Sequence, residues 1–253
     1  MRGLARRYNG TDEYHEVASG IVTAPPISVY MRVRFRSSAA GTFLSMQRSG
    51  IGNWDGFYAE LTSGSIVIGT PVNNNFSASW SSPAMIRTWR WYDIIAVWAS
   101  TTSRYGIING KTPLPPNTTS GTPTGVPNRF SIGASRHGAI TDNYSSVDVE
   151  RIGVWSAVLN LSDAARLMRG EFETVRRREI VDMWAMNGLR AGASDEGSLL
   201  NKNTLSDVNA PDLIRVNAPP LMPPRRLYVS EQAAAGSTIF ARRSLTPRIG
   251  RRR

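Results

Sequence analysis

The sequence predicts an all-β fold of antiparallel strands with one short helix. Residues 92–98 form an apolar run rich in aromatic and branched side chains, and residues 27–35 alternate between apolar and other side chains. Start and stop signals of a helix flank an apolar stretch convincingly only near residues 161–170. Strand periodicity therefore dominates, which is typical of a β-sandwich.

The run from Tyr92 to Trp98 carries apolar side chains on both faces of the predicted strand. Positions 92, 94, 96 and 98 share one face, while Ile95 and Val97 accompany Asp93 on the other. This pattern indicates a strand buried on nearly both faces. Asn109-Gly110 follows a second alternating segment and tolerates the positive φ of a tight turn, so one hairpin followed by another is expected.

Residues 27–35 predict a strand with one apolar face and one basic face. Val29, Met31 and Val33 lie on the first, and Arg32 and Arg34 on the second, which Arg36 continues. Further strands are expected at 8–17, 42–47, 56–61, 65–68, 129–133, 147–155 and 180–186.

One short helix is predicted after the last strand of the main run. Leu161-Ser162 offers a hydrophobic residue followed by an N-cap, Leu167 and Met168 supply an apolar side, and Gly170 ends the helix.

Composition favours one soluble domain. The chain has 253 residues and 41% hydrophobic content, which suffices for one sizeable core. Cysteine is absent, so disulfides, thiolate chemistry and Cys-ligated zinc are excluded. No eighteen consecutive apolar residues occur, and the basic start has no apolar segment behind it. No membrane partner and no secretory signal are therefore expected.

The positive charge is almost entirely arginine. Thirty Lys+Arg against nineteen Asp+Glu give a formal charge of +11, and Lys111 and Lys202 are the only lysines. Codon bias of a GC-rich genome explains the ratio of arginine to lysine slightly better than interface chemistry does. The placement is more telling, because basic residues gather at both ends: Arg2, Arg6, Arg7, Arg242, Arg243, Arg248, Arg251, Arg252 and Arg253.

Composition also divides the chain into four parts. A basic lead at 1–7 is followed by the sandwich at 8–190. Residues 191–226 form a Pro-rich segment, poor in strand patterns, that is expected to lie extended along the body. Residues 227–253 are expected to be a basic arm that needs a partner to become ordered.

The order of segments resembles laminin-G-like and pentraxin-like domains. The resemblance rests on WYDIIAVWASTTSRYGIINGK at 91–111, FSIGAS at 130–135, VDVERIGVWSAVLNLSDAARL at 147–167 and YNGTDEYHEV at 8–17. It covers roughly residues 8–190. It implies a concanavalin A-like jelly roll, two antiparallel sheets packed face to face. Such modules also occur in virion proteins of tailed bacteriophages, as head decoration or fibre proteins.

Enzyme chemistry finds little support in the sequence. Glycosidases of this fold carry a Glu-x-Asp-x-Glu type of strand, whereas residues 146–150 keep Asp148 and Glu150 but have Ser146 in the first position. The two acids are therefore interpreted as solvated or salt-bridged strand residues. His15 and His137 lack spaced ligand partners, so neither a metal nor another cofactor is predicted. We expect a non-enzymatic protein.

Two functions remain, a structural one and a binding one. The main hypothesis is a capsid decoration or cement protein on the exterior of a bacteriophage virion, whose terminal arginines bind the major capsid protein or another virion subunit. Nucleic acid ranks lower as the acidic partner, and homo-oligomerisation is left open. The alternative is a carbohydrate-binding module of a tail fibre or surface adhesion protein. Its glycan-binding residues would be Asn53, Trp54, Asp55 and Tyr58, with Trp80 and Trp89 as other candidates, although tryptophans in a sandwich usually pack in its core.

Overall fold

The computed structural model describes residues 3–48, 53–112, 114–137, 140–186, 196–197, 203–209 and 211–216. All of them belong to one compact unit, residues 1–222. Its strands are β1 (Gly3–Asn9), β2 (Tyr14–Val17), β3 (Ile27–Phe35), β4 (Gly41–Gln47), β5 (Gly56–Thr62), β6 (Ser65–Gly69), β7 (Ser79–Ser81), β8 (Trp91–Ser100), β9 (Ser103–Ile108), β10 (Arg129–Ile132), β11 (Ser135–His137), β12 (Ile140–Asp142), β13 (Ser146–Trp155), β14 (Ile180–Trp184), β15 (Glu196–Gly197), β16 (Thr204–Val208) and β17 (Asp212–Val216). The helices are α1 (Leu161–Met168) and two 3-10 turns, η1 (Phe172–Thr174) and η2 (Arg177–Glu179). No helix among these residues is long and apolar enough to cross a bilayer.

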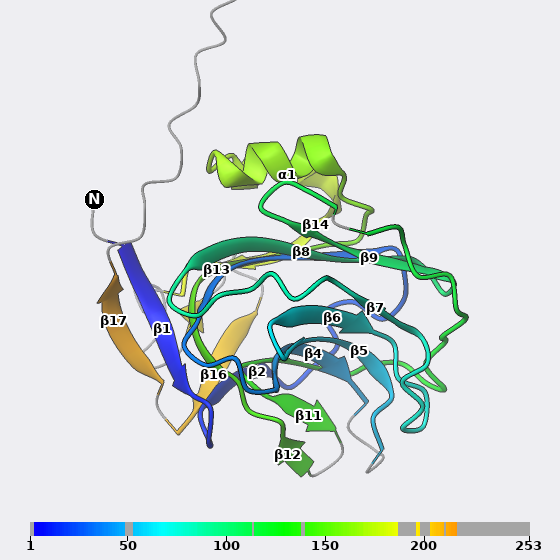
Figure 1. Ribbon diagram of the computed structural model, residues 1–253, viewed down its shortest axis with the longest axis horizontal. Helices are drawn as coiled ribbons and strands as arrows, with labels where there is room; N and C mark the ends of the chain where they lie inside the picture. Colours follow the sequence, from blue (N-terminus) through cyan, green and yellow to red (C-terminus); the bar gives the residue numbers. More distant parts are fainter. Residues whose placement is uncertain are drawn as a thin grey trace, which may run out of the picture. The chain divides into compact units, whose positions relative to one another are not determined.

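Two antiparallel sheets pack face to face, which confirms the predicted jelly-roll sandwich (Figure 1). The seven-stranded sheet has the order β17-β1-β13-β3-β8-β9, with β14 also paired to β13. The eight-stranded sheet has the order β15-β16-β2-β10-β4-β5-β6-β7. The hairpin of β11 and β12 lies against the outer side of the eight-stranded sheet, next to β4.

The apolar face of each strand lines the space between the two sheets. Val29, Met31 and Val33 of β3 are at most 1% exposed and belong to the main core, as their alternation predicted. Leu44 and Ala59 meet them from the eight-stranded sheet. The close packing of two branched apolar faces supplies most of the stability of such a sandwich.

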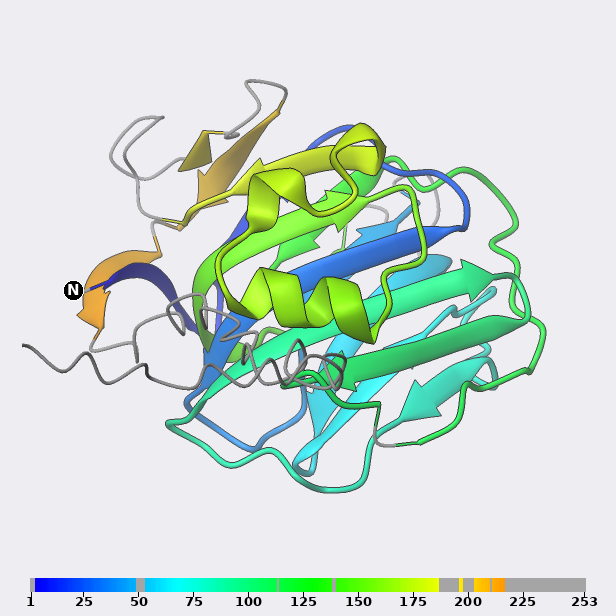
Figure 2. The same cartoon turned by 90° about the horizontal axis from the view of Figure 1, so that it is seen from above.

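A second core lies on the other side of the seven-stranded sheet, under α1 (Figure 2). Ile95 and Val97 of β8 and Trp155 of β13 are nearly inaccessible to solvent there. Trp155 Nε1 donates a hydrogen bond of 2.9 Å to the carbonyl of Val175, which fixes the segment after α1 to the sheet. The prediction that β8 is buried on nearly both faces is confirmed.

Helix α1 begins one residue earlier than its predicted cap. Asn160, and not Ser162, is the N-cap, and its side chain accepts hydrogen bonds from the backbone of Ser162 and Asp163. The backbone N–H of Asn160 donates in turn to the carboxylate of Asp163, which completes a capping box. Gly170 follows the helix at φ +88°, as a residue that stops a helix should.

The predicted first strand at 8–17 is wrong, because the chain turns inside it. Asn9 accepts hydrogen bonds from the backbone of Thr11 and Asp12, and Gly10 adopts φ +82°. The turn places β1 in one sheet and β2 in the other. Residues 3–7 also belong to β1, so the expected basic lead at 1–7 is corrected, as far as it is described, to a strand between β13 and β17.

The segment after residue 190 contributes strands that its composition did not reveal. β16 pairs with β2, and β17 pairs with β1. Leu205 of β16 is fully buried in the main core. The described part of 191–226 is thus extended, as expected, but it enlarges both sheets. Residues 227–253 lie outside the described residues.

Asn109-Gly110 forms the predicted tight turn without a full second hairpin. Asn109 has φ +50° and Gly110 φ +74°. The turn is closed by a single bridge between Ile108 and Lys111, and no named strand starts there.

The basic face of β3 is held by carboxylates and tryptophan rings. Asp148, which is fully buried, lies 2.6 Å from Arg34 and 3.0 Å from Arg7. The guanidinium of Arg34 also lies over the Trp91 ring, 5.2 Å from its centroid. Glu150 contacts Arg32 at 2.9 Å. The interpretation of Asp148 and Glu150 as salt-bridged strand residues is therefore confirmed.

We predict that Asp148→Ala lowers the free energy of unfolding by about 3 kcal/mol, because it leaves two arginines on the sheet without their shared counter-ion. Urea denaturation followed by tryptophan fluorescence measures the change. Glu171→Ala serves as the control, because its ion pairs with Arg166 and Arg169 are partly exposed to solvent and their removal should leave the midpoint nearly unchanged. A wild-type midpoint for Asp148→Ala would contradict the structural role of this ion pair.

Candidate functional site

An aromatic cluster lies where the loop before β5 meets the loop between β6 and β7. It consists of Trp54, Tyr58, Phe76 and His137. The Trp54 ring centroid lies 5.5 Å from those of Tyr58 and Phe76 and 5.3 Å from that of His137. Phe76 is 41% exposed, and Trp54 is half-buried. Tyr58 and His137 are only 2% and 3% exposed, so Phe76 and Trp54 form the part of the cluster that is open to solvent.

Strand alternation places Tyr58 on the outer face of the eight-stranded sheet. Its neighbours Phe57 and Ala59 point into the main core, so the Tyr58 ring points away from it. The ring lies directly over Gly69 of β6, where an added Cβ would come within 2.2 Å of a ring carbon. Glycine at position 69 thus lets the tyrosine lie flat on the sheet and support Trp54.

Two loops are joined beneath the cluster by amide hydrogen bonds. The Asn74 side chain accepts from the backbone N–H of Trp54 at 2.8 Å and donates to the side chain of Asn53 at 3.0 Å. Asn73 and Asn74 adopt φ of +49° and +64°, a conformation that asparagine tolerates better than most residues. The run of asparagines at 73–75 therefore builds the turn that places Phe76 beside Trp54.

Asp55 differs from its predicted role, because its carboxylate faces inward. It is fully buried and accepts hydrogen bonds from the backbone N–H of Thr124 at 2.9 Å and from its hydroxyl at 2.6 Å. Its own N–H donates to Gln47. Asp55 anchors the loop to the 114–128 segment and presents no oxygen to solvent, so it is removed from the set of direct glycan contacts.

The hydroxyl of Tyr58 remains a neutral hydrogen-bonding group. Burial, and then the charge of Glu60, raise the pKa of Tyr58 well above its ordinary value. The phenol therefore keeps its proton at every physiological pH. Within the described part of the chain the hydroxyl makes no hydrogen bond. Tyr58 is only 2% exposed, so its predicted role as a direct glycan contact is corrected to that of a support for Trp54.

Sequence reasoning missed Phe76 and His137. His137 comes from β11, and its Nε2 lies 3.3 Å from a carboxylate oxygen of Asp142 on β12. It reaches Trp54 only because the hairpin folds over the outer face of the sheet (Figure 1). An aromatic residue just after an Asn-rich turn was the available signal for Phe76, whereas no local signal marks His137.

The other tryptophan candidates lie elsewhere. Trp80 is 3% exposed, and its Nε1 donates to the carbonyl of Pro115. Trp89 is 57% exposed, but it lies just before β8 of the seven-stranded sheet, beneath the guanidinium groups of Arg34 and Arg36. Neither contacts the aromatic cluster.

The arginines of the capsid hypothesis are only partly described. Arg6 is 2% exposed and donates to the carbonyl of Pro211, and Arg7 pairs with Asp148. Both are therefore corrected from an anchoring lead to parts of a sheet. The remaining arginines of that hypothesis lie outside the described residues: Arg2, Arg242, Arg243, Arg248, Arg251, Arg252 and Arg253.

No protein-family model matches the chain, and no curated protein matches its sequence. Solved structures do match. A heptameric SAP-like pentraxin from Limulus polyphemus is 18% identical with a TM-score of 0.51, over 64% of this chain and 80% of that one. A candidate carbohydrate-binding protein from Bacteroides ovatus is 11% identical with a TM-score of 0.60, over 86% of this chain and 61% of that one.

A third match is the carbohydrate-binding module CBM40 of a Ruminococcus gnavus sialidase, solved with α2,3-sialyllactose. It is 15% identical with a TM-score of 0.52, over 64% of this chain and 95% of the module. Identities this low show the fold alone. Together with the two packed antiparallel sheets, they establish that the chain has the concanavalin A-like jelly-roll fold shared by pentraxins and lectin-like carbohydrate-binding domains.

Proposed function

We propose that this chain is a non-catalytic carbohydrate-binding protein and that the aromatic cluster is its glycan site. The observation that carries the proposal is the open apolar surface of Trp54 and Phe76, bordered by the amides of Asn53 and Asn74. Aromatic faces beside polar groups suit ligands that have one apolar and one polar side. A pyranose ring has this character, with C–H groups on its faces and hydroxyls at its rim.

The exposed rings and the loops that hold them have separate roles in this proposal. Phe76 and Trp54 cover the C–H face of a sugar, and the exposed amide of Asn53 binds its hydroxyls, while the buried Tyr58 supports the Trp54 ring. The hydrogen bonds of Asn74 and Asp55 hold the two loops before any ligand arrives. A site assembled in advance loses less conformational entropy on binding.

Catalysis is not part of the proposal. Asp148 and Glu150, the acids in the strand that glycosidases of this fold use, are each engaged by arginine. Ser146 stands where a third carboxylate would be required. The expectation of a non-enzymatic protein stays a prediction on this basis.

The capsid-cement hypothesis also stays a prediction, together with its virion location. Structural neighbours with lectin-like folds favour the glycan proposal over it. With Arg6 and Arg7 held in the sheet, cement function now depends on residues 227–253 and Arg2.

Alanine at Trp54 should remove retention on an immobilised glycan, with a loss of at least about tenfold in affinity, because the stacking surface disappears. A glycan array identifies the ligand, and frontal affinity chromatography measures the loss. Phe76→Ala tests the same surface at a more exposed position that the fold tolerates easily. Trp89→Ala removes an exposed tryptophan elsewhere and should bind like wild type. Equal retention of all three variants would refute the site.

Deletion of residues 227–253 separates the two functions. Under the glycan proposal the truncated chain keeps full glycan retention, since the cluster lies wholly within residues 53–137. Under the cement hypothesis the same deletion abolishes salt-sensitive co-sedimentation with undecorated phage heads. Head binding by the full chain alone, combined with an empty glycan array, would favour cement function.

A further inference from the structure

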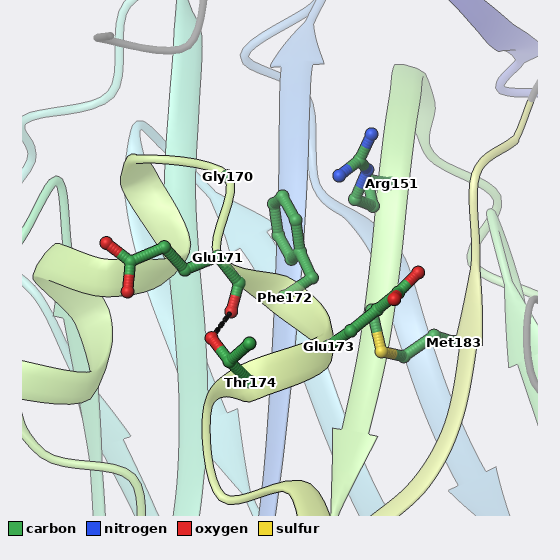
Figure 3. A pocket seen from close by; sticks show the side chains of 7 residues that line it. All are labelled: Arg151, Gly170, Glu171, Phe172, Glu173, Thr174 and Met183. Atoms are coloured by element: carbon green, nitrogen blue, oxygen red, sulfur yellow. Dashed lines mark hydrogen bonds between the residues drawn. The ribbon is translucent and has the colours of Figure 1, made fainter. Parts of the chain in front are cut away.

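A pocket of about 240 Å³ opens on the face of the seven-stranded sheet that carries α1. Arg151 of β13 and Met183 of β14 form one wall, and the segment from Gly170 to Thr174 forms the other. Figure 3 shows the guanidinium of Arg151 beside the ring of Phe172 at its centre. We call it the Arg151 pocket.

Arg151 has no counter-ion at bonding distance. Within the described part of the chain its guanidinium makes no hydrogen bond and no ion pair, in contrast to Arg32 and Arg34 on the neighbouring strand. Burial lowers the pKa of Arg151 below its ordinary value, although the group stays protonated. A half-buried charge without a partner costs free energy, which a bound anion would recover.

The stacking of Arg151 on Phe172 leaves the N–H groups at the edge of its guanidinium available to a ligand. The carbon of the guanidinium lies 4.1 Å from the centroid of the Phe172 ring, so one face of the group is covered by the ring. Phe172 is 3% exposed and packs against Tyr30 at 5.3 Å, which fixes its position. A stacked guanidinium offers its N–H groups in one plane, as a carboxylate requires for two parallel hydrogen bonds.

Two acidic residues of the pocket differ in their availability. Glu171 accepts hydrogen bonds from Arg166 at 2.9 Å and from Arg169 at 2.8 Å, and in Figure 3 its carboxylate points away from Arg151. Glu173 is exposed at the rim and makes no hydrogen bond within the described residues. Glu173 disfavours a doubly charged ligand by repulsion, but it can accept hydrogen bonds from ligand hydroxyls.

We propose that the Arg151 pocket binds the carboxylate of a small hydroxylated acid, of the size and type of a sugar acid. The carboxylate lies in the plane of the Arg151 guanidinium, and hydroxyls of the ligand donate to Glu173. A monoanion neutralises Arg151 with less repulsion from Glu173 than a dianion such as phosphate.

This inference does not depend on the proposed glycan site. The aromatic cluster lies on the outer face of the eight-stranded sheet, whereas the Arg151 pocket lies on the outer face of the other sheet, beside α1. The main core separates the two sites, so each can be abolished without the other.

Titration of the full chain with sodium glucuronate tests the proposal, with glucose as the neutral analogue and inorganic phosphate as the dianion. Methyl-labelled methionine provides a local signal, because Met183 lines the pocket. We expect saturable shifts of the Met183 methyl resonance with glucuronate at a Kd of about 1 mM, the affinity that two charge-assisted hydrogen bonds support. Glucose should cause no such shift, and phosphate should bind more weakly.

Two arginine variants locate the binding. Arg151→Gln should weaken glucuronate binding at least about tenfold. Its thermal midpoint without ligand should stay near that of wild type, because no ion pair is lost. Arg166→Gln removes a neighbouring arginine that is already paired with Glu171, and should bind glucuronate like wild type. Trp54→Ala should likewise leave this titration unchanged.

Each contrary result overturns a defined part of the proposal. An unshifted Met183 resonance at saturating glucuronate would show that the pocket binds no such acid. Equal shifts with glucose would remove the role of the carboxylate, and tighter binding of phosphate would contradict the predicted class. Full affinity in a folded Arg151→Gln variant would place the ligand elsewhere, as would loss of affinity in Trp54→Ala.

Discussion

Burial of strand β8 on both of its faces is the constraint on which the rest of this structure depends. One face of β8 must meet the eight-stranded sheet, and the other must also be kept from water. The chain meets the second requirement with α1 and the segment that follows it, which Trp155 holds to the sheet through Val175. Among the described residues, the outer face of the eight-stranded sheet carries no comparable apolar layer. It is therefore free to bear polar side chains and the exposed rings around Trp54.

The part of the seven-stranded sheet that α1 does not cover carries outward-facing charges. Arg32 and Arg34 of β3, and Arg36 just after it, face outward. Acids from β8 and β13 and two tryptophan rings hold this group of arginines. Charges that are paired and stacked in this way are stabilised without reaching bulk water. Arg151 lies beside this network and lacks such a carboxylate. The proposed ligand of its pocket rests on this contrast between Arg151 and its neighbours more than on its charge alone.

Strand alternation and apolar runs predicted the strands and their buried faces, because residues 27–35 and 92–98 report directly which side chains are buried, whereas the jelly-roll arrangement was implied by the resemblance to laminin-G-like and pentraxin-like domains. The turns that end a strand were harder to predict. The turn at Asn9 and Gly10 lies inside a continuous strand-like pattern, and it depends on side-chain hydrogen bonds that the pattern does not contain. The short strands β16 and β17 exist because they pair with β2 and β1, so their own composition could not reveal them.

The proposed glycan site was predictable in part for the same reason. Trp54 and Tyr58 lie four residues apart in one segment, and their proximity follows from local geometry. Asp55 is a residue type that can bind a sugar, but its burial depends on Thr124, which is far from it in the sequence. His137 and Phe76 approach Trp54 only through the folding of separate loops. Local sequence therefore identified the centre of the cluster and not its boundary.

Asn74 has an evolutionary consequence. It bonds to the backbone of one loop residue and to the side chain of another while it forms the turn of its own loop. The two loops consequently cannot diverge independently, since a change in either must preserve this shared contact or replace it. They would be inherited and exchanged as one cassette. Replacement of both loops together would change the surface around Trp54 while the sandwich beneath it stays the same.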